Sequence, residues 1–139
     1  MRDVTAKKVI LVVDDDSTNI RYLVELLRST YSILVAKDGK AALRIARSDA
    51  APDLILLDVM LPDIDGYEVC RELRNDVVTG GIPIIFISGK DGKEDEVRGF
   101  ETGAADYLTK PFQPVIVKAR VAMHLELKGY RALVAGRSI

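Results

Sequence analysis

The chain has 139 residues, 48% apolar and 29% charged, and its 20 basic residues nearly balance 21 acidic ones. This composition is typical of one globular domain with a hydrophobic core, and no basic stripe indicates binding to nucleic acid. The apolar runs are far shorter than the ~20 residues of a membrane-spanning helix, and the N-terminus lacks a signal-peptide pattern. The single cysteine, Cys70, fits a reducing compartment. We therefore expect a cytosolic protein without membrane contact.

Short apolar runs alternate with helical patterns along the chain. The apolar runs predict five strands, over residues 9–13, 32–36, 54–57, 82–87 and 106–108. Between the first two runs, Ile20, Leu23, Val24 and Leu27 fall on one face of a predicted helix. Four more helices are predicted over about 39–47, 66–74, 92–102 and from 114 to 127 or beyond.

Residues at the helix ends support these boundaries. Asp65 with Glu68, and Asp91 with Glu94, have the spacing of a capping box, in which the N-cap side chain accepts a hydrogen bond from the backbone three residues later. Gly103 suits the position after a helix, where the backbone often turns left-handed. These residues therefore predict two helix beginnings and one helix end.

Five strands that alternate with five helices predict an α/β fold. The strands are continuously apolar, as in parallel sheets that are buried on both faces. The expected topology is a flavodoxin-like doubly wound sheet of five parallel strands in the order 2-1-3-4-5, in a single domain. We assign residues 1–8 to an N-terminal arm, 9–127 to this domain, and 128–139 to a helical extension or the start of a linker.

Polar residues follow several strands at the same edge of the predicted sheet. Asp14 and Asp15 follow the first strand, Asp58 the third, Ser88 the fourth and Lys110 the fifth. Taken singly, each residue is more simply explained as a turn residue, a helix cap or a solvated side chain. In sheets of this topology, however, ligands bind at this edge, next to the point where the strand order reverses. Because two such charges ~4 Å apart repel by about 4 kcal/mol at an effective dielectric near 20, the carboxylates need a cation. Their oxygens suit Mg²⁺, or Mn²⁺, beside a phosphoryl group.

These segments resemble the response-regulator receiver domain of two-component signalling. The matching pieces are ILVVDDD at 10–16, PDLILLDVMLPDIDGYEVCRELR at 52–74, IPIIFISGK at 82–90 and GAADYLTKPF at 103–112. The resemblance implies that Asp58 is the phosphoacceptor. It also implies that Asp15 is a direct Mg²⁺ ligand, that Asp14 acts through water, and that the backbone carbonyl of Met60 is a further ligand.

The resemblance also implies how such a switch works. A partner histidine kinase or phosphotransfer protein supplies the phosphoryl group, and the domain catalyses its own phosphorylation and slow hydrolysis without being a turnover enzyme. Lys110 pairs with the phosphoryl oxygens, Ser88 moves to bind them, and Tyr107 rotates inward. The surface of the fourth helix, fifth strand and fifth helix then changes. Met60 and Lys90 stand where the family tunes hydrolysis, and a cis bond is common before the proline after Lys110.

Several features leave alternatives open. The last helix is apolar on more than one face, which indicates either a thick core stripe or a partner surface, used for dimerisation through the fourth and fifth helices or for joining an output domain. His124 is expected on the surface, and Cys70 as a packing residue. Two other functions stay open. One is a phosphatase of the haloacid-dehalogenase type, which would have an Asp at the position of Met60 and an additional cap domain. The other is a scaffolding module, which would not bind Mg²⁺.

Overall fold

The computed structural model describes residues 7–89 and 93–137. Its strands form one parallel sheet in the order β2-β1-β3-β4-β5. The strands are β1 (Val9–Val13), β2 (Ser32–Ala36), β3 (Leu54–Asp58), β4 (Ile84–Ser88) and β5 (Asp106–Thr109). The helices are α1 (Ser17–Leu27), α2 (Gly39–Ala46), α3 (Gly66–Asn75), α4 (Lys93–Glu101) and α5 (Pro114–Arg137). The predicted α/β class, doubly wound topology and strand order are confirmed.

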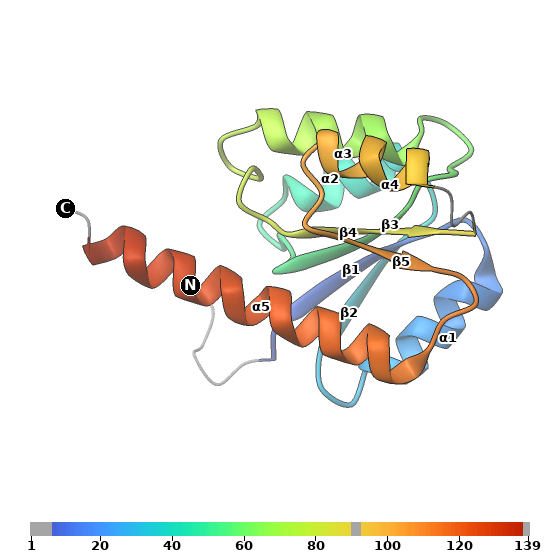
Figure 1. Ribbon diagram of the computed structural model, residues 1–139, viewed down its shortest axis with the longest axis horizontal. Helices are drawn as coiled ribbons and strands as arrows, with labels where there is room; N and C mark the ends of the chain where they lie inside the picture. Colours follow the sequence, from blue (N-terminus) through green and yellow to red (C-terminus); the bar gives the residue numbers. More distant parts are fainter. Residues whose placement is uncertain (1–6, 90–92, 138–139) are drawn as a thin grey trace.

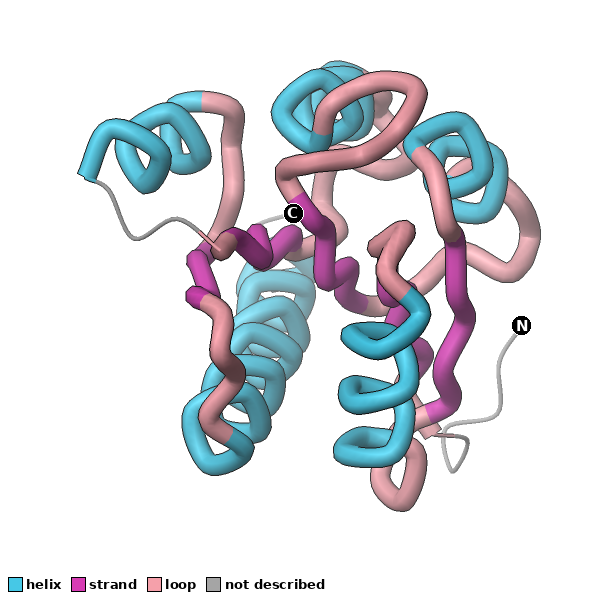
Figure 2. Tube along the Cα trace, turned by 90° about the vertical axis from the view of Figure 1, so that its right-hand side faces the viewer, coloured by secondary structure: helices cyan, strands magenta, loops and turns pink. Residues whose placement is uncertain are grey.

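The sheet lies between two helical layers. Helices α2, α3 and α4 cover one face, and α1 and α5 cover the other (Figures 1 and 2). Alternate residues of each inner strand point to opposite layers, so that Leu11 and Ile55 join the core under α2 and α3, while Ile10 and Leu54 join the core with α1 and α5. Both faces of the inner strands are therefore apolar, as the continuous runs predicted.

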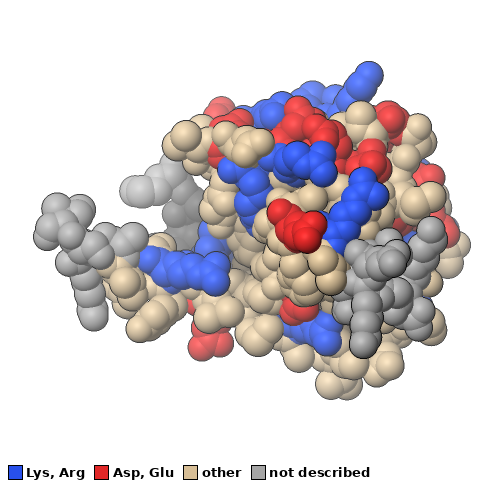
Figure 3. Space-filling model, turned by 45° about the horizontal axis from the view of Figure 1, so that its top comes forward, with Lys and Arg blue, Asp and Glu red and all other residues tan. Residues whose placement is uncertain are grey.

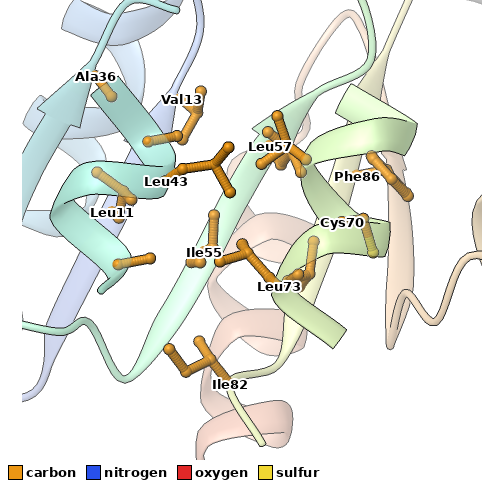
Figure 4. Close-up of a cluster of buried hydrophobic side chains, with 14 of the residues drawn as sticks. Leu11, Val13, Ala36, Leu43, Ile55, Leu57, Cys70, Leu73, Ile82 and Phe86 are labelled. Atoms are coloured by element: carbon orange, nitrogen blue, oxygen red, sulfur yellow. The ribbon is translucent and has the colours of Figure 1, made fainter. Parts of the chain in front are cut away.

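The core beneath α2 and α3 is drawn in Figure 4. Leu43 and Leu73 from the two helices meet Leu57 and Phe86 from β3 and β4, and all four are buried. Cys70 lies in the same cluster, fully buried, and burial raises the pKa of its thiol. The prediction that Cys70 is a packing residue is confirmed.

Three expectations need correction or fall outside the described residues. The edge strand β2 is partly open, with Val35 38% exposed, because β2 lies at the end of the strand order and, among the described residues, pairs only with β1. β4 begins at Ile84, after Pro83, which has no N–H to donate to the sheet. The cap predicted at Asp91 lies outside the described residues. By contrast, Asp65 accepts a hydrogen bond of 2.9 Å from the Glu68 N–H, as predicted.

Helix α5 is longer than its core-facing part requires. It continues past residue 127 to Arg137, so the division that we placed at 127 falls within one helix. Its buried stripe consists of Val117, Val121 and His124. The expected surface position of His124 was wrong, because the residue lies on this stripe, with Nε2 2.9 Å from a carboxylate oxygen of Asp106. The i, i+4, i+7 spacing of the three residues contained that information.

The surface of the helical layer formed by α2, α3 and α4 carries both signs of charge. Figure 3 shows acidic and basic side chains intermixed there rather than separated into fields of one sign. Exposed ion pairs account for part of this pattern, such as Arg47 with Asp76 at 3.5 Å. In the part of the chain that the structure describes, no helix combines the length and apolarity needed to cross a bilayer.

Gly66 provides a test of how closely helix α3 approaches the end of strand β3. A Cβ at this position would lie 2.9 Å from the Cα of Val59 and would also press on the carbonyl oxygen of Asp58. We expect Gly66→Ala to lower the free energy of unfolding by about 1–3 kcal/mol, measured by chemical denaturation. Gly129→Ala is the matched control, because nothing lies near its Cβ position, and it should stabilise α5 by about 1 kcal/mol. Equal effects of the two substitutions would contradict this explanation.

Candidate functional site

The sheet brings the ends of four strands to one edge. Val13 at the end of β1 is level with Leu57 of β3, and Asp58 is level with Ile87 of β4. Ser88, the last residue of β4, is level with Thr109 of β5. Asp14 and Lys110, which directly follow β1 and β5, therefore reach the same edge as Asp58 and Ser88.

The central contact of this edge joins Asp58 to Lys110. The Nζ of Lys110 donates a hydrogen bond of 2.8 Å to one carboxylate oxygen of Asp58, and the backbone N–H of Met60 donates one of 2.8 Å to the other. Asp58 is almost fully buried. Burial opposes the charge of Lys110, but its hydrogen bond to Asp58 and the nearby carboxylates raise its pKa overall. The peptide bond between Lys110 and Pro111 is cis.

Asp14 adds a second carboxylate to the contact. Its side chain is fully buried, and one oxygen accepts a hydrogen bond of 2.9 Å from the Asp16 N–H. The other oxygen is buried without a hydrogen-bond partner and lies 3.6 Å from the Nζ of Lys110. Burial, and then the charge of Asp58, raise the pKa of Asp14 to about 6, although the Asp16 N–H and Lys110 oppose the shift. One lysine thus serves two carboxylates.

The remaining predicted metal ligands are placed differently. Asp15 is exposed, and within residues 7–89 and 93–137 no three acidic, histidine or cysteine side chains converge closely enough to hold a metal ion. Met60 is 69% exposed. The buried oxygen of Asp14 that lacks a hydrogen bond nevertheless fits a cation site, since a hard cation would bind it and offset the charge of Asp58. Lys90 lies outside the described residues.

Ser88 and Tyr107 lie on the two outer strands of the site. Ser88 is buried at the end of β4. The side chain of Tyr107 is already buried, and its hydroxyl makes no hydrogen bond. Its ring centroid is 6.3 Å from that of Phe86, and a Cβ on Gly99 would lie 3.3 Å from the ring. The aromatic residue that we expected to rotate inward therefore occupies the inward position in this structure.

Two contacts near Tyr107 were not foreseen from the sequence. Arg120 of α5 donates a hydrogen bond to the carbonyl oxygen of Tyr107 and lies 3.6 Å from a carboxylate oxygen of Asp106. On the other side, the guanidinium of Arg98 in α4 lies 4.3 Å from the centre of the Tyr67 ring, a cation–π contact. The first contact connects β5 to α5, the second connects α4 to α3, and no local sequence pattern marks either pair.

The raised pKa of Asp14 predicts a pH-dependent change in stability. Because the folded-state pKa of about 6 lies above the unfolded value of 3.8, the charge of Asp14 destabilises the fold increasingly as the pH rises through this interval. With a chelator present, we expect Asp14→Asn to raise the free energy of unfolding by up to about 3 kcal/mol above this interval and to have little effect below it. Denaturation at several pH values measures this difference. A constant difference, or the same profile for Asp49→Asn at an exposed site, would contradict it.

Comparison with known proteins agrees with this geometry. Residues 10–122 match the response regulator receiver domain family. The chain is 48% identical to the response regulator PleD of Caulobacter vibrioides over 113 residues, covering 81% of this chain and 25% of that protein. It is 49% identical over 115 residues to the alkaline phosphatase synthesis transcriptional regulatory protein PhoP of Bacillus subtilis, covering 82% of this chain and 47% of that protein. The chain thus spans half or less of the length of these relatives.

Solved structures show the same similarity. A response regulator described as putative from Chloroflexus aurantiacus superposes with a TM-score of 0.83 at 36% identity, covering 86% of this chain and 98% of that one. The BeF3-activated DrrB receiver domain superposes with a TM-score of 0.79 at 36% identity, with the same coverage of both chains. The chain belongs to the response regulator receiver domain family of two-component signalling proteins.

Proposed function

We propose that this chain is a phosphorylation-dependent switch that accepts a phosphoryl group on Asp58. The observation that carries this proposal is the contact of Asp58 with Lys110 beside the buried carboxylate of Asp14. Asp58 stands at the end of a buried strand in a domain of the receiver family, and an aspartate can act as a covalent nucleophile toward phosphorus. The donor is a phosphohistidine of a sensor kinase or a phosphotransfer protein.

The transfer step exchanges one bond to phosphorus for another. An oxygen of Asp58 attacks the phosphorus, the bond from phosphorus to the histidine nitrogen breaks, and the histidine leaves with that electron pair. Lys110 supplies positive charge to the phosphoryl oxygens, and the hydroxyl of Ser88 donates a hydrogen bond to one of them. The domain catalyses this modification and its slow hydrolysis, but it does not turn over a free substrate.

Asp14, Asp15, Asp58 and the backbone carbonyl of Met60 would hold Mg²⁺ in this proposal. The buried oxygen of Asp14 without a hydrogen bond supports such a site, as does the excess of carboxylates over lysine. Asp15 is exposed, so its side chain can turn toward the cation. When bound, the ion supplies positive charge that stabilises the transferred group. Met60 and Lys90 would influence the rate of hydrolysis from beside the phosphoryl group.

The phosphoryl group would act by stabilising one arrangement of β4, β5 and their helices. The phosphoryl group interacts more favourably with the arrangement in which the Ser88 hydroxyl donates a hydrogen bond to it. Phosphorylation therefore shifts the population of molecules toward that arrangement. We assign the inward position of Tyr107, seen in this structure, to the favoured state. The surface formed by α4, β5 and α5 would then be read by a partner, a second copy or an output domain.

The remaining assignments follow from this role. We take residues 9–127 as the receiver domain, preceded by the arm at 1–8 and followed by the extension at 128–139, and we place the protein in the cytoplasm with its kinase. The relatives that exceed this chain in length support an output domain in the whole protein. No observation favours the phosphatase or scaffold alternatives, since Met60 is exposed where a phosphatase would have its acid and the family match is to receivers.

Labelling by a small acyl phosphate tests the phosphoacceptor. With Mg²⁺ and acetyl phosphate, intact-mass measurement should show one added phosphoryl group on the parent chain and none on Asp58→Asn, because the amide is a poor nucleophile. Asp49→Asn changes an exposed aspartate outside the site and should label like the parent chain. Undiminished labelling of the Asp58 variant would refute the assignment.

The lifetime of the phosphorylated state is a separate prediction. Neither Met60 nor Lys90 is a side chain that readily activates water, so hydrolysis should be slow. After removal of the phosphodonor, we expect the mass of the phosphorylated chain to persist for minutes or longer, and Met60→Glu to shorten this time by offering a base near the attacking water. Complete loss of the label within seconds, in the absence of a phosphatase, would contradict this expectation.

A further inference from the structure

A cavity lies at the amino-terminal edge of the sheet, opposite the edge that carries Asp58 and Lys110. Residues 80–83 and 103–105 line it, and these two loops lead into β4 and β5. The second half of α5 forms another wall, because this helix begins shortly after the end of β5 and runs back past the sheet (Figure 1). The cavity has a volume of about 720 Å³, which is within the range of small-molecule sites.

The charged side chains of this cavity are basic. Arg74 of α3 and Lys128 and Arg131 of α5 line it, and among the described residues no carboxylate does so. Lys128 lies 3.6 Å from a carboxylate oxygen of Asp53, which offsets part of its charge. Neither arginine forms an ion pair with a residue that the structure describes. The cavity therefore has an excess of positive charge.

Arg74 is fixed in position, but its charge is not compensated. Its Nε donates a hydrogen bond of 2.7 Å to the carbonyl oxygen of Gly103, and its Nη1 donates bonds of 3.0 and 2.7 Å to those of Gly80 and Ile82. Its Nη2 has no hydrogen-bond acceptor among the described residues. The guanidinium is partly buried, and burial lowers its pKa. Because a buried cation without a counter-charge is costly, this group favours an anion in the cavity.

The rest of the lining is small and mostly apolar. Its apolar members are Val78, Ile82, Pro83, Ala104, Ala105 and Ala132. A Cβ added to Gly81, which also lines the cavity, would meet no atom within 4 Å. Such a surface fits the ring or hydrocarbon part of an organic molecule, whereas a small inorganic ion would leave most of the volume unfilled.

We propose that this cavity binds a small organic phosphate of nucleotide size, with its phosphate groups against Arg74, Lys128 and Arg131. Guanidinium groups match the geometry of phosphate oxygens and bind them by charge-assisted hydrogen bonds. A diphosphate offers several negative charges to the three basic side chains, which a single carboxylate does not. The organic part of the ligand lies against the apolar lining.

This site goes beyond the proposed phosphorylation switch and does not depend on it. The strands are parallel, so the loops that precede β4 and β5 lie at the edge opposite the predicted phosphoacceptor. Without a bound cation, the two carboxylates of Asp14 and Asp58 against one lysine disfavour an anion at that other edge. Nucleotide binding in the presence of a chelator therefore reports on the cavity.

Titration calorimetry with ADP, in the presence of a chelator, tests the binding. The parent chain should bind one ADP with a millimolar or tighter dissociation constant, and Arg131→Glu should weaken binding at least tenfold. Lys118→Glu is the matched control, because it makes the same change of charge at an exposed position of α5 outside the cavity, and it should bind like the parent chain. No binding by the parent chain at millimolar ADP, or equal effects of the two variants, would overturn the proposal.

Competition with related molecules tests which part of the ligand is recognised. Inorganic pyrophosphate should displace ADP, whereas adenosine should not, because the basic side chains bind the phosphates. Citrate offers several carboxylates instead of phosphates and should bind at least tenfold more weakly than ADP. Displacement by adenosine, or equal affinity for citrate, would contradict a phosphate site.

A change of shape without a change of charge tests the location. Ala132→Phe narrows the cavity and should weaken ADP binding, whereas Ala119→Phe, at an exposed position of the same helix outside the cavity, should not. In amide NMR spectra, ADP should shift the signals of residues 80–83 and 103–105. Shifts confined to the edge that carries Asp58, or loss of ADP binding in Asp58→Asn, would place the anion at the other edge and overturn the proposal.

Discussion

The contact of one lysine with two buried carboxylates is the constraint around which this structure is arranged. Asp14 and Asp58 extend from neighbouring strands whose apolar residues fill both cores, so neither carboxylate can move into solvent without disturbing the sheet. Lys110 reaches both, at 3.6 and 2.8 Å, but a single ammonium group cannot neutralise two carboxylates. The site therefore favours added positive charge, from a proton on Asp14 or from a cation.

This edge of the sheet is mechanically connected to the helices behind it. Lys110 directly follows β5, Tyr107 lies within that strand, and Arg120 joins the Tyr107 carbonyl to α5. The ring of Tyr107 in turn packs beside Phe86 of β4 and Gly99 of α4. A change in the position of Lys110 thus reaches α4 and α5 through covalent and packed contacts. That path supplies a physical route for the proposed switch.

Helix α5 combines two surfaces that the sequence presented as one apolar pattern. Val117 and Val121 pack into the core shared with α1, whereas Leu127 and Tyr130 remain exposed beyond the sheet. A thick core stripe therefore explains only part of the apolar residues in this helix. The remaining apolar residues stay exposed on the half of the helix that extends beyond the sheet.

The sequence by itself determined the strands, most helix boundaries and the strand order, because hydrophobic period and capping are local and crossovers are right-handed. It also located Asp14, Asp58, Ser88 and Lys110 at one edge, since the carboxyl ends of parallel strands meet there. Only the tertiary structure decided that His124 pairs with Asp106, that Asp15 remains exposed and that Tyr107 points inward. Burial of an individual side chain, and any pKa shift that follows from it, depends on neighbours distant in sequence, which no local pattern specifies.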